Sequence, residues 1–470
     1  MVLPLPAGEG RGEGERSQSS PRVQKHREHC LPAPLIASAR KPRLASFATA
    51  CLLFPLVLLS TITPAFAQDQ VTTLAGSPLA NGAADGSTIL ARFSDPAAIG
   101  VDARGNIFIA DNANHTIRKL TPDGTVSTFA GRAGVPGSAD GAGAAARFDS
   151  PSGLAIDRAG NVFVSDTGNH TLRKISPSGQ VTTVAGTAGE SAALDGSGPA
   201  ARFNSPLGLA VDSSGVVFVA DSGNHLIRRV ASDGTVSTFA GRAENFGSTD
   251  GAGTNAAFNN PVGLALDASG NLFVADANNH CVRKISSTGV VTTFAGTPDA
   301  DGCVDGAGAN ARFSKPAELA FDPRGNLYVA DAFNHTLRKV SPAGIVISVS
   351  GVAGADGAGD GANRSARFYN PYGVAFDLRG HLLVSDTYNQ TLRRVLVPFT
   401  VTLNAAPAGG SLISWDAVAG RRYQVQFKDT ATAARWQNLG GVLTAEGQTA
   451  SQPDPAPAPS RCYRIQLAEP

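Results

Sequence analysis

The chain has 470 residues, more than one ordinary hydrophobic core accommodates. Its formal net charge of +1 gives no global bias toward nucleic acid or another polyanion, so neither is expected as a partner. Charged residues make up only 16% of the chain, whereas 53 glycines and 29 prolines are typical of a turn-rich, all-β protein.

The N-terminal part differs in composition from the rest. Residues 1–39 are rich in proline, glycine and charge, so we expect them to be disordered, and their length indicates a misassigned translation start. Residues 40–67 combine a basic segment, an apolar run and an Ala-x-Ala site ending at Ala67, which is typical of a cleaved secretory signal. A retained membrane anchor is the alternative. The signal predicts an exported protein (periplasmic, cell-surface or extracellular) with no membrane span after cleavage.

An internal repeat dominates residues 71–397. The motif Asp-x-x-Asn-His-x-x-Arg recurs every 55 residues in six copies without insertion or deletion, and only the sixth copy departs from it, with Gln390 for histidine. The motif aspartates are Asp111, Asp166, Asp221, Asp276, Asp331 and Asp386. The motif histidines are His115, His170, His225, His280 and His335. The motif arginines are Arg118, Arg173, Arg228, Arg283, Arg338 and Arg393.

Each repeat holds four short apolar runs rich in β-branched and aromatic residues, separated by turns that contain glycine or asparagine. Four antiparallel strands form one propeller blade, so six repeats predict a six-bladed β-propeller. The fourth strand is missing after the sixth motif, and its copy lies at residues 71–76. We therefore expect this N-terminal strand to complete the last blade and close the ring. A partial blade that hangs free is the alternative.

The repeats resemble the NHL family, named for the Asn-His-Leu signature that Asn224, His225 and Leu226 spell here. The resemblance covers residues 71–397 and implies the propeller fold. It indicates little about function, because the family includes binding platforms, lyases and uncharacterised exported proteins.

A residue that is present in every blade most simply has the same structural role in each blade. We expect each motif aspartate to cap its own turn, each asparagine to take the left-handed conformation, each histidine to pack between blades and each arginine to pair with an aspartate. The alternative, a ring of histidines around a metal ion, would need ligands that converge on one point. An Asp-Gly pair also recurs in the long loops, and the loop that carries Asp299, Asp301 and Asp305 is the candidate for weak Ca²⁺ binding.

Function is expected where the six-fold symmetry breaks, on the face that gathers the long loops and the motif turns. Blades five and six carry the atypical residues there, with neutral drift as the alternative: Lys315, Glu318, Phe333, Tyr369, Tyr372 and Tyr388. Cys281 and Cys303 are a disulfide candidate, or else two small buried residues.

Residues 400–467 lose the period, contain both tryptophans and predict a small fibronectin-III-like β-sandwich. No catalytic motif occurs in the chain, so we predict a monomeric, cofactor-free scaffold that binds a protein or a glycan. One alternative is a metal-dependent lactonase- or lyase-like propeller enzyme with its site at the central channel. Another is a structural component of the cell envelope.

Overall fold

The computed structural model describes residues 70–362, 365–396, 401–405, 410–416, 422–430, 435–446, 449–457 and 461–467. The predicted disordered segment (1–39) and the signal (40–67) lie outside these residues. Within the described parts the regular structure is β-strand with short 3₁₀ turns. The described residues include no helix with the length and apolarity that crossing a membrane requires.

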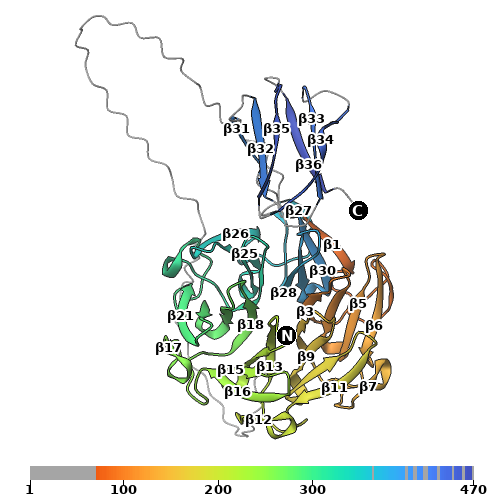
Figure 1. The fold of residues 1–470 in the computed structure, drawn as a ribbon. Coiled ribbons are helices and arrows are strands. Elements are labelled where there is room, and N and C mark those ends of the chain that lie inside the picture. Colours follow the sequence, from red (N-terminus) through yellow and green to blue (C-terminus); the bar gives the residue numbers. More distant parts are fainter. Residues whose placement is uncertain are drawn as a thin grey trace, which may run out of the picture. The chain divides into compact units, whose positions relative to one another are not determined.

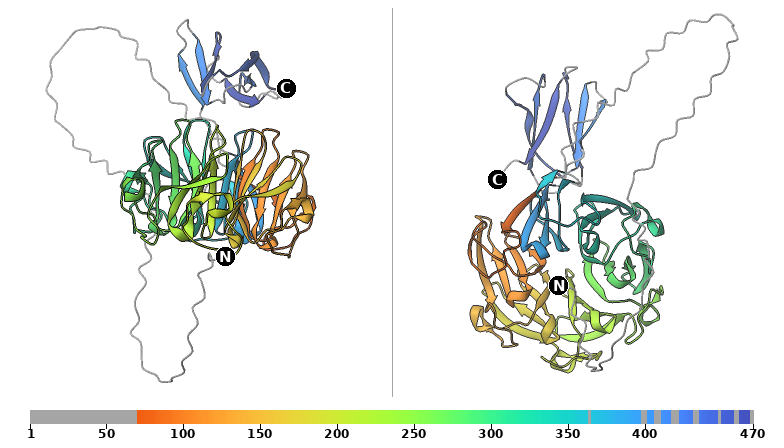
Figure 2. Two further views of the ribbon diagram at one scale, coloured as in Figure 1. Left: turned by 60° about the horizontal axis from the view of Figure 1, so that its bottom comes forward. Right: turned by 180° about the vertical axis from the view of Figure 1, so that it is seen from behind.

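Six sheets, one for each repeat, are arranged around a common centre, as Figures 1 and 2 show. The predicted six-bladed, all-β propeller is therefore confirmed. Blade one comprises β2 (Gly86–Ser87), β3 (Pro96–Val101), β4 (Ile107–Asp111), β5 (Thr116–Leu120) and β6 (Thr125–Gly131). Blade two comprises β7 (Gly141–Ala142), β8 (Pro151–Ile156), β9 (Val162–Asp166), β10 (Thr171–Ile175) and β11 (Gln180–Ala185). Blade three comprises β12 (Gly196–Ser197), β13 (Pro206–Val211), β14 (Val217–Asp221), β15 (Leu226–Val230) and β16 (Thr235–Ala240).

The second half of the ring repeats this order. Blade four comprises β17 (Gly251–Ala252), β18 (Pro261–Leu266), β19 (Leu272–Asp276), β20 (Cys281–Ile285) and β21 (Val290–Ala295). Blade five comprises β22 (Gly306–Ala307), β23 (Pro316–Phe321), β24 (Leu327–Asp331), β25 (Thr336–Val340) and β26 (Ile345–Gly351). Blade six comprises β27 (Gly361–Ala362), β28 (Pro371–Phe376), β29 (Leu382–Asp386), β30 (Thr391–Leu396) and β1 (Gln70–Gly76).

Each blade has five strands rather than the predicted four. The additional strand has two residues and pairs with the outermost long strand, as Gly86 does with Val126 in blade one. The 55-residue repeat has room for it in the long loop that precedes each first strand. This short strand covers the outer edge of the blade, which would otherwise present unpaired backbone groups to solvent.

The ring closes through the N-terminal strand, as the repeat phase predicts. Strand β1 runs antiparallel to β30, with Val71 opposite Val395 and Gly76 opposite Thr391, and it pairs with β27 on its other side. The first strands of the six blades contact one another in turn, and β28 contacts β3. These first strands therefore surround the axis of the ring.

The second strands are buried on both faces because each blade is sandwiched between two neighbours. Ile107, Phe108, Ile109 and Ala110 of β4 are all buried, although alternate side chains point to opposite faces.

Between second and third strands lies a 3₁₀ turn in every blade: η1 (Asn112–Asn114), η3 (Thr167–Asn169), η5 (Ser222–Asn224), η7 (Ala277–Asn279), η9 (Ala332–Asn334) and η11 (Thr387–Asn389). Among the residues that the structure describes, long loops contain the 3₁₀ turns η2 (Gly143–Ala145), η4 (Gly198–Ala200), η6 (Gly253–Asn255) and η8 (Gly308–Asn310).

Two three-stranded sheets follow in the C-terminal part. One consists of β31 (Val401–Ala405), β32 (Ser411–Asp416) and β35 (Thr449–Asp454), and the other of β33 (Arg422–Lys428), β34 (Gln437–Thr444) and β36 (Cys462–Leu467). Trp415 from the first sheet and Tyr423 from the second share one buried cluster. The fibronectin-III-like assignment and the domain boundaries at 397 and 400 stay predictions, since residues 397–400 lie outside the described parts.

Candidate functional site

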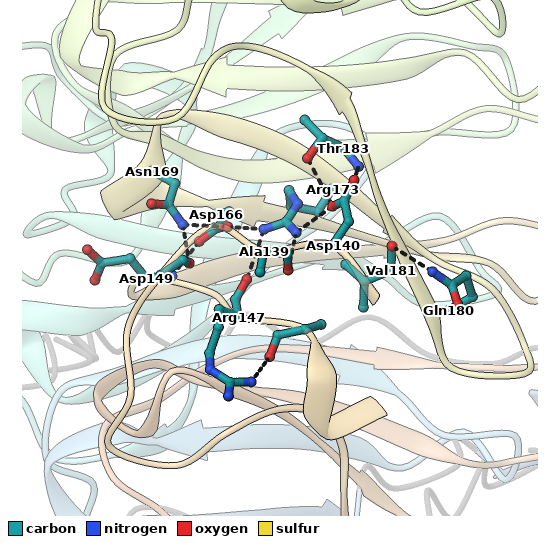
Figure 3. A network of polar contacts seen from close by, with 12 residues as sticks. Ala139, Asp140, Arg147, Asp149, Asp166, Asn169, Arg173, Gln180, Val181 and Thr183 are labelled. Carbon is teal, nitrogen blue, oxygen red and sulfur yellow. Dashed lines mark hydrogen bonds and ion pairs between the residues drawn. The ribbon is translucent and has the colours of Figure 1, made fainter. Parts of the chain in front are cut away.

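A buried ion-pair network occupies every blade, and Figure 3 shows the copy in blade two. The guanidinium group of Arg173 is fully buried, and its Nη1 atom donates to Asp166 Oδ2 over 2.5 Å and to the Arg147 carbonyl over 3.0 Å. Its Nη2 atom donates to Asp140 Oδ1 over 2.7 Å and to the Ala139 carbonyl over 3.1 Å. One arginine thus joins the second strand, the third strand and the long loop of its blade.

The same network recurs in all six blades. The inner pair is fully buried, with N–O distances from 2.5 to 2.9 Å, and the outer pair with the loop aspartate spans 2.6 to 2.8 Å. The repeated arginines therefore have a structural role within each blade. The outer aspartates are those of the recurring Asp-Gly pairs: Asp85, Asp140, Asp195, Asp250, Asp305 and Asp360.

Burial raises the pKa of the six motif aspartates to about 6, against the opposing influence of the arginine and of the amide donors around each carboxylate. All these neighbours are hydrogen-bond donors, which suits the ionised form. The carboxylates therefore carry their charge at neutral pH.

The motif turn differs in two details from the expectation. Asp111 does not cap η1; its Oδ1 atom accepts the Ser94 N–H over 2.7 Å and its Oδ2 atom accepts the Asn114 side-chain amide over 2.8 Å. The left-handed residue is His115, with φ of 57°, and not Asn114. The reason is that the Asn114 amide also reaches the Gly82 carbonyl, 2.6 Å away, which holds Asn114 within the 3₁₀ turn.

The motif histidines join neighbouring blades. His115 Nδ1 accepts the Ser150 N–H of blade two over 3.0 Å, so its ring carries a proton on Nε2. His170, His225, His280 and His335 accept a backbone N–H of the following blade in the same way, over 3.0 to 3.2 Å. Gln390 replaces histidine at the contact between blades six and one, where its Oε1 atom accepts the Asp95 N–H over 2.6 Å. A side chain that accepts this N–H is therefore present in all six blades.

The acidic loop of blade five was the strongest Ca²⁺ candidate. Asp305 Oδ1 already accepts Arg338 and Ser348, each over 2.8 Å, whereas Asp299 and Asp301 lie near His280 and influence its pKa. The structurally described residues include no group of three or more His, Cys, Asp or Glu side chains placed to hold a metal ion. Calcium binding at this loop stays a prediction.

The atypical residues of blades five and six form three contacts on or near the loop face. The Lys315 ammonium lies 4.7 Å from the centre of the Phe333 ring, which is 44% exposed. The Tyr369 ring lies between His335 at 5.7 Å and Tyr388 at 5.0 Å, in edge-to-face contacts that join the two blades. The third contact joins the first strands of the two blades.

This third contact involves Glu318 of β23 and Tyr372 of β28. Glu318 is only 7% exposed, and burial raises its pKa to about 8. The two residues lie on neighbouring first strands that contact each other, and burial first, and then the charge of Glu318, raises the pKa of Tyr372 far above its ordinary value. Glu318 is thus a buried group rather than part of a solvated loop, and its carboxyl does not pair with Lys315.

One residue of this surface was missed from the sequence. Leu79 has a φ of 59° and is 72% exposed, so a branched apolar side chain occupies a left-handed position in solvent. Its N–H donates to the Asn389 carbonyl over 3.0 Å, which places its backbone next to the motif turn of blade six. The equivalent residues are Gly134, Gly189 and Gly354 in three repeats and the left-handed Glu244 and Asp299 in the other two, so the apolar character of Leu79 was a usable signal.

The cysteine prediction does not agree with the structure. Cys281 is a buried free thiol at the start of β20, so the Cys281–Cys303 bridge is not formed. The two residues lie near different arginines: Cys281 beside Arg283 of blade four and Cys303 beside Arg338 of blade five. The alternative interpretation as a small buried residue fits Cys281.

Fold and repeat network together define a six-bladed β-propeller, and solved structures share this fold. A Bacteroides thetaiotaomicron protein of unknown function is 22% identical with a TM-score of 0.55, and the match covers 70% of this chain and 75% of that one. A protein from the same organism, described as an auxiliary nutrient binding protein, is 15% identical with a TM-score of 0.55, over 70% and 76% of the two chains.

The family model "NHL repeat" matches residues 148–175, 203–230 and 258–285. NHL repeat-containing protein 2 of Bos taurus is 31% identical over 394 residues, which cover 75% of this chain and 53% of the relative. The protein of the same name from Homo sapiens is 30% identical over 322 residues, or 61% and 44% of the two chains. The chain spans about half the length of these relatives. Residues 148–175, 203–230 and 258–285 are thus NHL repeats within the six-bladed β-propeller.

Proposed function

We propose that the protein is an exported binding scaffold and that a protein partner contacts its loop face at blades five and six. The proposal of export rests on residues 40–67. The binding surface is supported by one position of the motif turn, at which blades five and six differ from the other four blades. Blades five and six have Phe333 and Tyr388 where the other four blades have Ala113, Gly168, Gly223 and Asn278.

The composition of this surface suits a protein partner. Its apolar side chains are Phe333 and Leu79, which are exposed, and Tyr388, which is partly exposed. Lys315 adds a positive charge next to Phe333. Large aromatic side chains dominate the energy of protein interfaces because they bury much area at little entropic cost. Two solved proteins with this fold are described as auxiliary nutrient binding proteins, so the scaffold is compatible with binding.

The alternative is a metal-dependent enzyme at the axis, resembling lactonase- or lyase-like propellers. Such a site needs several polar residues on the first strands. Glu318 is the only ionisable residue at its level, where the other blades have Ala98, Gly153, Gly208, Gly263 and Gly373. The loop-face surface is therefore the better-supported candidate.

The test compares variants in a screen of peptide and glycan arrays with the labelled protein. We expect peptide ligands, and we expect the Phe333→Ala/Tyr388→Ala double variant to bind them about tenfold or more weakly, the cost of losing aromatic anchors. Asn278→Ala changes the equivalent position of blade four and serves as the matched control. Peptides that bind both variants equally, or hits confined to glycans, would contradict the proposal.

A further inference from the structure

Glu318 occupies a position where four of the six blades have glycine. We call the six equivalent positions the axial ring: Ala98, Gly153, Gly208, Gly263, Glu318 and Gly373. A Cβ atom on any of the four glycines would lie 2.0 to 2.4 Å from a carbonyl oxygen of the next blade. At the four glycines, the backbones of neighbouring first strands therefore approach closely. The other blades pack without a long side chain at this position, so packing does not explain the presence of Glu318.

Glu318 also lacks a cationic partner. Each of the six motif aspartates has its arginine, and Asp454 has Arg461. Asp322 accepts the side-chain amide of Asn326. The carboxyl of Glu318 instead has the Leu319 N–H and the neighbouring Tyr372, and no ion pair among the described residues. A buried carboxylate without a counter-charge is costly, which favours the neutral form of the Glu318 carboxyl.

The surroundings of Glu318 suit a cation. Tyr372 lies on the neighbouring first strand β28, which contacts β23, and its partly exposed aromatic ring can receive a positive charge. The chain already uses this chemistry nearby, since the Lys315 ammonium lies over the Phe333 ring. Pro316, two residues before Glu318, is opposite Asp331 at the end of β24 that leads into the motif turn. Glu318 is therefore close to the loop face.

We propose that Glu318 and Tyr372 form a site for a primary ammonium group, which belongs to the ligand that the loop face binds. The inference rests on the proposed binding function and specifies the chemistry of its ligand. The arriving ammonium group supplies the missing counter-charge, and the Glu318 carboxyl releases its proton to solvent and becomes a carboxylate. A neutral ligand of the same shape gains nothing from this group.

Titration calorimetry with benzylammonium chloride and with benzyl alcohol at pH 7 tests the inference. We expect the ammonium compound to bind about tenfold or more tightly than the alcohol. We also expect release of close to one proton per molecule bound, measured by comparing phosphate and MOPS buffers. Glu318→Gln keeps the shape of the side chain and should remove both the preference and the proton release. Glu244→Gln, at an exposed loop position, is the control that should retain both.

Equal affinity for the two compounds, binding of neither at millimolar concentration, or an unchanged preference in Glu318→Gln would each overturn the inference. Its failure is distinct from failure of the proposed function. If the ammonium preference is absent while Phe333→Ala/Tyr388→Ala still weakens peptide binding, only the ammonium site is wrong. If the preference is present and the double variant binds peptides normally, the proposed surface is wrong and the ammonium site remains.

Discussion

Replacing Asp221 by alanine is expected to lower the free energy of unfolding of the propeller by about 3–5 kcal/mol. The substitution leaves the guanidinium of Arg228 fully buried without its inner carboxylate, which now lies 2.7 Å away. It also removes the acceptor for the Asn204 N–H and the Asn224 amide. Urea unfolding followed by far-ultraviolet circular dichroism provides the measurement.

Asp195→Ala is the matched control for this variant. Asp195 pairs with the same arginine over 2.7 Å, but its side chain is half exposed, so water replaces the lost contact. We expect a clearly smaller loss of stability. Equal losses from the two substitutions would show that the inner pair has no special importance, and would contradict the structural role assigned to the repeated motif.

Acidification is expected to weaken the contacts between blades through the histidines. Burial lowers the pKa of His170, His225, His280 and His335 below the ordinary value of 6.5, despite nearby acidic groups in three of the four cases. The unfolded chain therefore binds more protons than the folded chain as the pH falls below 6.5. The stability contributed by these residues is complete above that value and is lost below it.

Protonation at Nδ1 replaces the acceptor of each backbone N–H by a donor, at a cost on the order of 1 kcal/mol for each hydrogen bond lost. The control is built into the chain, because Gln390 accepts the same N–H without titrating. Changing the four histidines to glutamine should flatten the dependence of stability between pH 7.5 and pH 5. The motif aspartates titrate near this range in the parent protein and in the glutamine variant alike. The difference between the two pH profiles of stability therefore reports on the histidines. Identical pH profiles would contradict the assignment.

The repeat made most of the propeller predictable. A strict period fixes the number of blades, and residues 71–76 keep that period although they precede the first motif, which is why ring closure could be predicted. The two-residue outer strands could not be predicted. Gly86 and Ser87 have no strand propensity, and they pair only because the long loop returns along the blade edge.

The candidate site was predictable only in part. Broken symmetry identified Phe333, Tyr369 and Tyr388, since aromatic residues replace small ones there. The burial of Glu318 and its closeness to Tyr372 depend on how two first strands meet, which sequence spacing does not encode. The left-handed histidines follow from the two hydrogen bonds of the preceding asparagine rather than from residue preference.

The proposed ligand surface belongs to blades five and six and not to the ring as a whole. Tyrosine-selective ¹³C labelling tests this directly, because the propeller tyrosines are Tyr328, Tyr369, Tyr372 and Tyr388, all in these two blades. On addition of a peptide found in the array screen, we expect the resonances of Tyr369, Tyr372 and Tyr388 to shift. Those of the buried Tyr328 and of Tyr423 and Tyr463 in the C-terminal sheets should stay in place. Saturated binding that leaves the first three resonances unmoved would contradict the placement of the ligand surface at blades five and six.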